Sequence, residues 1–184
     1  MVILIIVLSF VVVLGIYLIV LYNGFVSKRN MLEEALSGID VILKKRFDLI
    51  PNLVETVKGY LTHEKETLAN IVSLRNQALN AGSEDEKLQL DKKLGTAVGT
   101  IFALAENYPD LKANTNFLSL QEELTEIETE VERSKRYYNA TVRDYNIAVE
   151  SFPGNIVANS FGFPKRSFLE LEDEKQRETP KVQF

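Results

Sequence analysis

The chain has 184 residues, a formal net charge of −5 at pH 7 and no cysteine. This length fits one ordinary domain, and an apolar fraction of 46% is enough to form a packed interior. The acidic balance argues against a dedicated nucleic-acid-binding protein, because such a protein presents a basic face to phosphate groups. The absence of cysteine excludes a cysteine nucleophile and leaves the redox compartment open.

The first 22 residues are almost entirely apolar and contain no charged side chain. As a helix with a rise of about 1.5 Å per residue, this run would extend roughly 33 Å, enough to cross a hydrocarbon core of about 30 Å. A secretory signal peptide needs a basic region before the apolar run and a small-residue cleavage site after it, and the sequence has neither. We therefore predict an uncleaved transmembrane anchor over residues 1–22.

The distribution of basic residues predicts the orientation of this anchor. Lys28 and Arg29 follow the apolar run, whereas only the amino terminus precedes it. Because basic residues favour the cytoplasmic side of a span, we expect a single-pass protein of the cell membrane, with its N-terminus outside and its body in the cytoplasm.

Beyond the anchor, apolar residues recur at steps of three and four, which is the period of an amphipathic helix. The pattern predicts helices over about 23–60, 63–79, 84–107 and 117–152. Ser83 is the expected N-cap of the third helix. Short links between such helices predict an all-α fold, in which the transmembrane helix precedes an antiparallel up-and-down four-helix bundle with long helices.

Pro51 lies inside the apolar stripe of the first predicted body helix. Proline lacks a backbone donor and clashes with the preceding turn, so we expect a kink or a short break near Phe47 and Asp48. Toward the C-terminus, residues 152–163 combine aromatic residues with Gly and Pro, which predicts a folded-back segment over one end of the core. The predicted organisation is an anchor over 1–22, a helical bundle over 23–164 and a charged, mobile tail over 165–184.

The sequence offers no complete catalytic motif. A metalloprotease helix would need a second histidine four residues after His63, and that position is Thr67. The chain also lacks a Gly-x-Ser-x-Gly turn and a phosphate-binding loop. We expect no catalytic residue, no metal and no cofactor, with His63 a structural residue at a helix start. An enzyme that uses only carboxylates, for instance Asp40, Asp48 and Glu64, is the alternative.

Two polar strips are the candidate partner-binding surfaces. Their residues recur at helical spacing beside the apolar stripe, and ordinary solvated surface is the competing interpretation. The carbonyl freed by Pro51 could add to the first strip by being exposed to a partner. The first strip consists of Asp40, Lys44, Asp48 and Asn52, and the second consists of Asn139, Arg143 and Asn146.

Two further patterns have plainer interpretations. The basic run of Lys44, Lys45 and Arg46 is flanked by acids and is interpreted as solvated helix surface. Gly95 and Gly99 have small-xxx-small spacing on an amphipathic helix, which predicts close helix packing, with a contact between two copies of the chain as the alternative.

Several blocks of the sequence resemble the signature of the bacterial LemA family. They extend over most of the chain, from about residue 24 to residue 164. The longest block is residues 39–60, followed by His63-Glu64, and the second is residues 106–114. The shorter ones are Tyr138-Asn139, Tyr145-Asn146, Phe152-Pro153 and Gly162-Phe163.

The resemblance implies a membrane-anchored helical bundle without known catalytic residues, often found beside membrane proteases. The expected function is a non-enzymatic membrane-tethered scaffold or adaptor that binds other membrane proteins in protease-linked quality control. The alternative is an oligomeric structural protein that organises the membrane. The expected partners are the bilayer, through residues 1–22, and a protein, with a membrane protease as one candidate. A homo-oligomer stays open, and nucleic acid is not expected.

Overall fold

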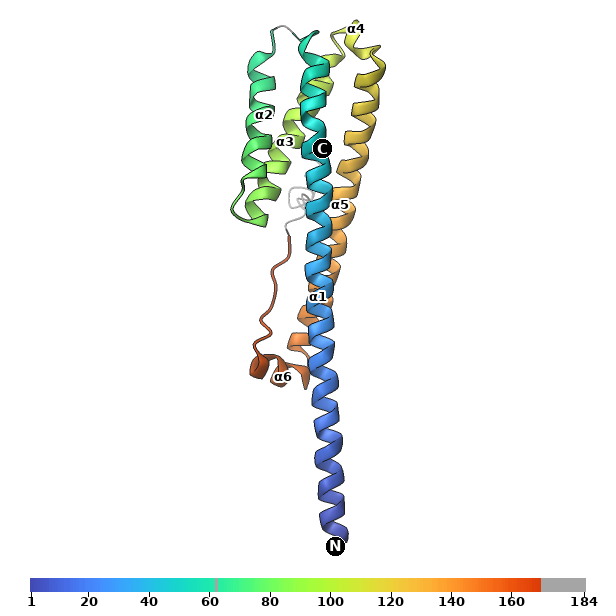
Figure 1. Cartoon of the computed structure of the whole chain (residues 1–184), viewed down its shortest axis with the longest axis vertical. Coiled ribbons are helices and arrows are strands. Elements are labelled where there is room, and N and C mark those ends of the chain that lie inside the picture. The colour runs from blue at the N-terminus through green and yellow to red at the C-terminus, as the bar shows by residue number, and fades with distance from the viewer. Residues whose placement is uncertain (62, 170–184) are drawn as a thin grey trace, which may run out of the picture. The chain divides into compact units, whose positions relative to one another are not determined.

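The computed structural model describes residues 1–61 and 63–169, and within these ranges the chain forms helices and no strand. The helices are α1 (Val2–Lys58), α2 (Lys65–Leu79), α3 (Glu84–Ala105), α4 (Pro109–Lys112), α5 (Thr115–Glu150) and α6 (Gly154–Phe161) (Figure 1). The all-helical class with an apolar N-terminal helix is confirmed. The number of helices in the bundle stays a prediction.

Helix α1 joins the predicted anchor and the first predicted body helix into one helix of 57 residues. Its N-terminal apolar side chains are exposed, and in the described part of the chain it is the helix long and apolar enough to cross a membrane. The helix continues through Pro51, so the break considered near Phe47 does not occur.

The chain divides into two compact units, and both α1 and α5 contribute to each of them. One unit combines Met1–Ser37 with the residues from Ser134 onward, and the other is Gly38–Arg133. The predicted domain boundaries at residues 22 and 164 stay predictions.

The unit Gly38–Arg133 has an apolar core made by the predicted periodic stripes. Most of its fully buried side chains come from α1, α2, α3 and α5, at the steps of three and four that place residues on one helix face, and Leu61, after α1, and Leu111 of α4 add to them. They include Ile39, Leu43, Phe47, Ile50, Leu53, Ile71, Leu94, Ile101, Ile127 and Val131.

Side-chain caps fix where two helices of this unit begin. The predicted cap of α3 is confirmed, because the Ser83 hydroxyl accepts a hydrogen bond from the Glu86 N–H at 3.2 Å. The Asn114 side-chain oxygen accepts from the N–H groups of Asn116 and Phe117 at 3.0 and 3.1 Å, so Asn114 caps α5. The Asn114 amide also donates to the Tyr60 hydroxyl at 3.1 Å, which ties the start of α5 to the segment after α1.

In the other unit, Phe163 is the centre of an aromatic cluster. Its ring stacks on Phe25 with a centroid distance of 5.2 Å and meets the edge of Tyr22 at 5.6 Å. The Arg29 guanidinium lies 5.6 Å from the ring centroid. Gly162, with a φ of +72°, ends α6 in the left-handed conformation and turns the chain so that Phe163 enters the cluster.

Residues 163–169 follow α6 as a segment without regular secondary structure. Residues 165–169, the first part of the predicted mobile tail, belong to this described segment. Residues 170–184, the rest of that tail, lie outside the described residues.

Candidate functional site

The first polar strip does not act as one surface. Lys44 and Asp48 form an exposed ion pair at 2.7 Å, one turn apart on α1, and Asn52 is exposed beyond them. Asp40 instead accepts a hydrogen bond from Lys87 of α3 at 2.7 Å. The structure therefore separates Asp40 from the other three residues and uses it in a contact between helices. The role of the strip in binding a partner stays a prediction.

Asp40 lies in a small charged cluster with Glu84 and Lys87. Burial raises the pKa of Glu84, and the hydrogen bond and negative charge of Asp40 raise it further. The hydrogen bond with Asp40 raises the pKa of Lys87. Two carboxylates thus share one ammonium group, which is an arrangement that joins α1 to α3.

Arg75 of α2 occupies the position where Pro51 interrupts the hydrogen bonding of α1. Because Pro51 has no N–H, the carbonyl of Phe47 loses its donor within the helix. The Arg75 Nε donates to this oxygen at 2.9 Å. The expectation that the freed carbonyl is exposed to a partner is wrong, because α2 supplies the missing donor. The same hydrogen bond satisfies the buried polar group and lets the helix continue.

We expect the roles of Arg75 and Pro51 to be coupled energetically. Arg75→Gln should lower the free energy of unfolding by about 1.5 to 3 kcal/mol, because it removes a charge-assisted hydrogen bond to a carbonyl with no other helical donor. In a Pro51→Ala background the helix regains its own N–H, so the same substitution should cost about 1 kcal/mol less. Urea denaturation of the four variants, followed by circular dichroism, measures the coupling. Equal costs in both backgrounds would contradict it.

A buried ion pair joins α1 to α3. Both oxygens of Asp91 lie 3.1 Å from the Arg46 Nη1, and the side chains of Arg46 and Asp91 are 5% and 2% exposed. Glu128 of α5 lies 2.6 Å from the same nitrogen. Arg46 is thus buried, and its interpretation as solvated surface is wrong. A Cβ atom on Gly95 would lie 2.6 Å from the Arg46 Nη2, so this glycine makes room for the guanidinium.

A sequence signal for this ion pair exists. Arg46 and Asp91 each occupy a position where the apolar stripe of their helix predicts an apolar residue. Leu43 and Ile50 flank Arg46 on α1, and Leu94 and Val98 follow Asp91 on α3 at helical spacing. A charged residue at such a position must find a partner, because an unpaired buried charge is costly. The sequence signal for the role of Arg75 is weaker. Pro51 indicates only that the carbonyl one turn before it needs a hydrogen-bond donor, and not which residue supplies that donor.

The second polar strip is occupied by the chain's own C-terminal segment. The Asn139 side chain donates to the carbonyl of Leu169 and accepts from its N–H, both at 2.9 Å. Asn146 does the same with Arg166, at 2.8 and 2.9 Å. Arg143, between them on the sequence, is exposed and paired with Asp144 at 3.1 Å. Two asparagines therefore hold one extended chain by four hydrogen bonds to its backbone.

The spacing of the two asparagines fits an extended peptide. Asn146 comes seven positions after Asn139 on the helix, a rise of about 10.5 Å. Arg166 and Leu169 are three residues apart, which spans about 9.3 Å in a polyproline II chain, where every third residue faces the same side. The bonds involve only main-chain atoms of the segment, so this part of the contact does not select its side chains.

The structure does not gather the acids of the enzyme alternative into one pocket. Asp48 pairs with Lys44, and Glu64 accepts a hydrogen bond from the Tyr108 hydroxyl at 2.7 Å, which raises the pKa of Tyr108. His63 is exposed, and its backbone N–H donates to the Glu64 carboxylate at 3.1 Å.

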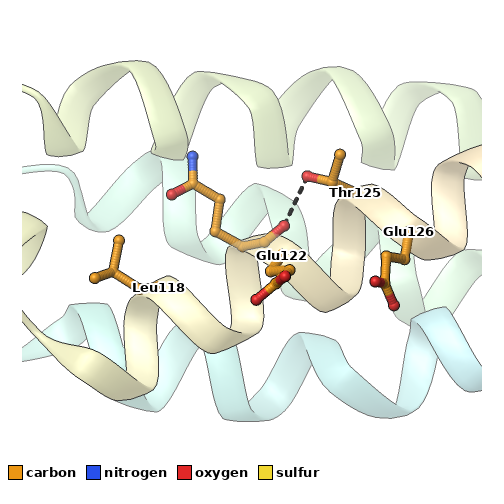
Figure 2. Close-up of a pocket in the computed structure, with 5 residues that line it drawn as sticks. Leu118, Glu122, Thr125 and Glu126 are labelled. Carbon is orange, nitrogen blue, oxygen red and sulfur yellow. Dashed lines mark hydrogen bonds between the residues drawn. The ribbon is translucent and has the colours of Figure 1, made fainter.

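Two of the hollows on the surface of the unit Gly38–Arg133 are shallow and open to solvent. One, of about 430 Å³, lies along α5, and all its lining residues come from that helix (Figure 2). They are Leu118, Gln121, Glu122, Thr125 and Glu126. The other, of about 160 Å³, lies beside Pro51 and Arg75. Neither hollow is lined by Asp40, Asp48 or Glu64. Over residues 1–61 and 63–169 there is no group of three or more side chains suited to hold a metal ion.

The fold defines an all-helical protein whose N-terminal apolar helix is long and apolar enough to cross a membrane. The sequence profile of the LemA family matches residues 35–184, and the chain belongs to this family. It is 27% identical over 156 residues to Protein LemA of Metamycoplasma hominis, an alignment that covers 83% of the chain and 71% of that relative.

Two magnetosome proteins are also similar to the chain. Magnetosome protein MamQ 2 of Paramagnetospirillum magneticum is 24% identical, over 83% of the chain and 66% of the relative. Magnetosome protein MamQ of Magnetospirillum gryphiswaldense is 22% identical, over 83% and 65%. The chain thus spans just under two thirds of the length of these two relatives, and none of the three relatives is named as an enzyme.

Proposed function

We propose that this protein is a non-enzymatic, membrane-tethered adaptor that binds an extended segment of another membrane protein. Residues 1–22 hold the body at the bilayer, and α5 supplies the binding surface. A membrane protease, or a protein degraded by one, is the partner that the family resemblance favours. The LemA and MamQ relatives support the membrane association and the non-enzymatic class.

The observation that carries this proposal is the pairing of Asn139 and Asn146 with a peptide backbone. A side-chain amide offers one donor and one acceptor, which match the N–H and carbonyl of a single residue. A second extended chain has the same groups at the same spacing and can take the place of residues 166–169. Arg143, exposed between the asparagines, is placed to select an acidic side chain in that second chain.

Co-isolation from native membranes tests this surface against the first polar strip. Full-length protein with Asn139→Ala and Asn146→Ala should recover less of any membrane-protein partner than the wild type. The matched control, Lys44→Ala with Asp48→Ala, removes an exposed pair of the first strip at little cost in stability. If α5 is the binding surface, this control should recover the wild-type amount of partner. If the control recovers less partner and the asparagine variant recovers the wild-type amount, the binding site is the first strip. Recovery of a second copy alone would favour the oligomeric structural alternative.

The proposed orientation places the body in the cytoplasm. The chain has no cysteine, so Ser167→Cys introduces a single thiol at an exposed position of the C-terminal segment. A membrane-impermeant maleimide should leave this thiol unlabelled in intact cells and label it after permeabilisation. Labelling of intact cells would reverse the orientation.

A further inference from the structure

Exposed apolar side chains lie on and beside α6, in the unit that contains the apolar part of α1. Phe152 is 81% exposed, Ile156 is 58% exposed and Phe161 is 60% exposed. Gly154, Val157 and Ala158 of α6 are buried, Ile156 projects away from them, Phe161 is the last residue of the helix and Phe152 precedes it. A short helix with a packed face and three exposed large apolar residues beside it requires something to cover those residues.

The contacts of α6 place this surface next to the end of the membrane span. The Phe161 ring meets the edge of Tyr22 with a centroid distance of 5.1 Å, and Tyr22 is the last residue of the uncharged apolar run. Figure 1 shows α6 beside α1 in this region. Phe163, directly after α6, packs on Phe25, one turn further along α1. The C-terminal end of α6 is therefore in contact with the end of the uncharged apolar run through Phe161 and Tyr22.

Cationic residues follow this surface on the side away from the span. Lys28 and Arg29 come one to two turns after Tyr22 on α1, and Lys165 and Arg166 come directly after the aromatic cluster. Arg29 lies over the Phe163 ring, and Lys165 is paired with Glu150. Aromatic residues at the level of the lipid headgroups, followed by basic residues, are the usual arrangement at a membrane interface.

We propose that the surface formed by Phe152, Ile156 and Phe161, here called the α6 surface, is seated in the headgroup region of the bilayer. The protein then touches the membrane at two places, through the span and through the α6 surface. Because residues 163–169 follow α6 directly, this second contact also fixes where the extended segment begins. The lipid contact does not depend on the proposed partner binding.

Tryptophan fluorescence tests the α6 surface without background, because the chain contains no tryptophan. Phe161→Trp and Phe152→Trp each place one probe on this surface. Tyr137→Trp is the matched control, since Tyr137 is 60% exposed on α5, about 20 Å of helix before Glu150, where α5 ends shortly before Phe152. The full chain in lipid nanodiscs is compared with and without brominated lipids, after circular dichroism has shown that each variant keeps its helicity.

We expect blue-shifted emission and strong quenching by brominated lipid for the probes at 152 and 161, and red-shifted, unquenched emission for the probe at 137. Red-shifted, unquenched emission at both 152 and 161 would overturn the proposal, because it would place the surface in water. Blue-shifted emission at both positions without quenching by brominated lipid would also overturn it, since protein would then cover the surface. Equal quenching of the probe at 137 would mean that position 137 lies as close to the lipid as the α6 surface. That result would also overturn the proposal.

Discussion

Replacing Arg46 by methionine is expected to lower the free energy of unfolding by about 3 to 5 kcal/mol, the typical cost of removing one partner from a buried ion pair. The substitution keeps the length of the side chain and removes the charge that faces Asp91. The Asp91 side chain is 2% exposed, so water cannot replace the lost guanidinium. Its carboxylate would remain in the interior without its two-oxygen contact to Arg46.

The double variant Arg46→Met with Asp91→Leu distinguishes the energetic cost of the buried charge from the cost of altered packing. If the cost of the single variant comes from the lost charge pairing of the buried Asp91 carboxylate, an apolar pair of similar volume should recover most of the stability. Urea denaturation followed by circular dichroism gives the three free energies. A cost below about 1 kcal/mol for the single variant would show that this ion pair does not hold α1 to α3.

Gly95→Ala and Gly99→Ala are expected to change stability in opposite directions, although both add one methyl group to α3. At Gly95 the new Cβ would lie 2.6 Å from the Arg46 Nη2, and the guanidinium cannot withdraw without losing Asp91. We expect a loss of about 1 to 3 kcal/mol, as for other insertions into a packed interior. At Gly99 no atom lies within 4 Å, so alanine should add up to about 1 kcal/mol through its helix propensity.

Thermal melting of the two variants beside the wild type measures this contrast. A lower melting temperature for Gly95→Ala and a higher one for Gly99→Ala is the expected result. Equal stabilisation by both substitutions would mean that Arg46 moves freely and that Gly95 has no packing role. Equal destabilisation would instead assign both glycines to a close contact, as the small-xxx-small pattern suggests for two copies of the chain.

The helices could be predicted from the sequence because each has a simple periodic cause. The apolar stripe through Ile39, Leu43 and Ile50 lies in the core, and Ser83 caps α3 as its position indicated. The continuity of α1 through Pro51 could not be predicted in this way. It depends on Arg75, which is 24 residues away on another helix, and a local pattern carries no information about such a donor.

The role of Asn139 and Asn146 in binding a partner stays a prediction. The sequence places both on one helix face, and that spacing is the feature that lets them hold an extended chain. Their pairing with Arg166 and Leu169 does not follow from the sequence, which predicts a mobile, charge-rich tail from residue 165 onward. A bond from a side chain to a backbone leaves no mark on the sequence of the segment that is bound.

Site-specific photocrosslinking from position 143 is the most direct test of α5 as an exchangeable peptide-binding surface. A photoreactive phenylalanine derivative in place of Arg143 lies between the two asparagines on an exposed position. Leu169→Asp, which puts a charge on the buried end of the bound segment, should release residues 166–169. We expect crosslinks to another membrane protein in native membranes, a higher yield with Leu169→Asp and a lower yield with Asn139→Ala and Asn146→Ala. Crosslinks that stay within the chain in all three backgrounds would contradict the proposed adaptor function.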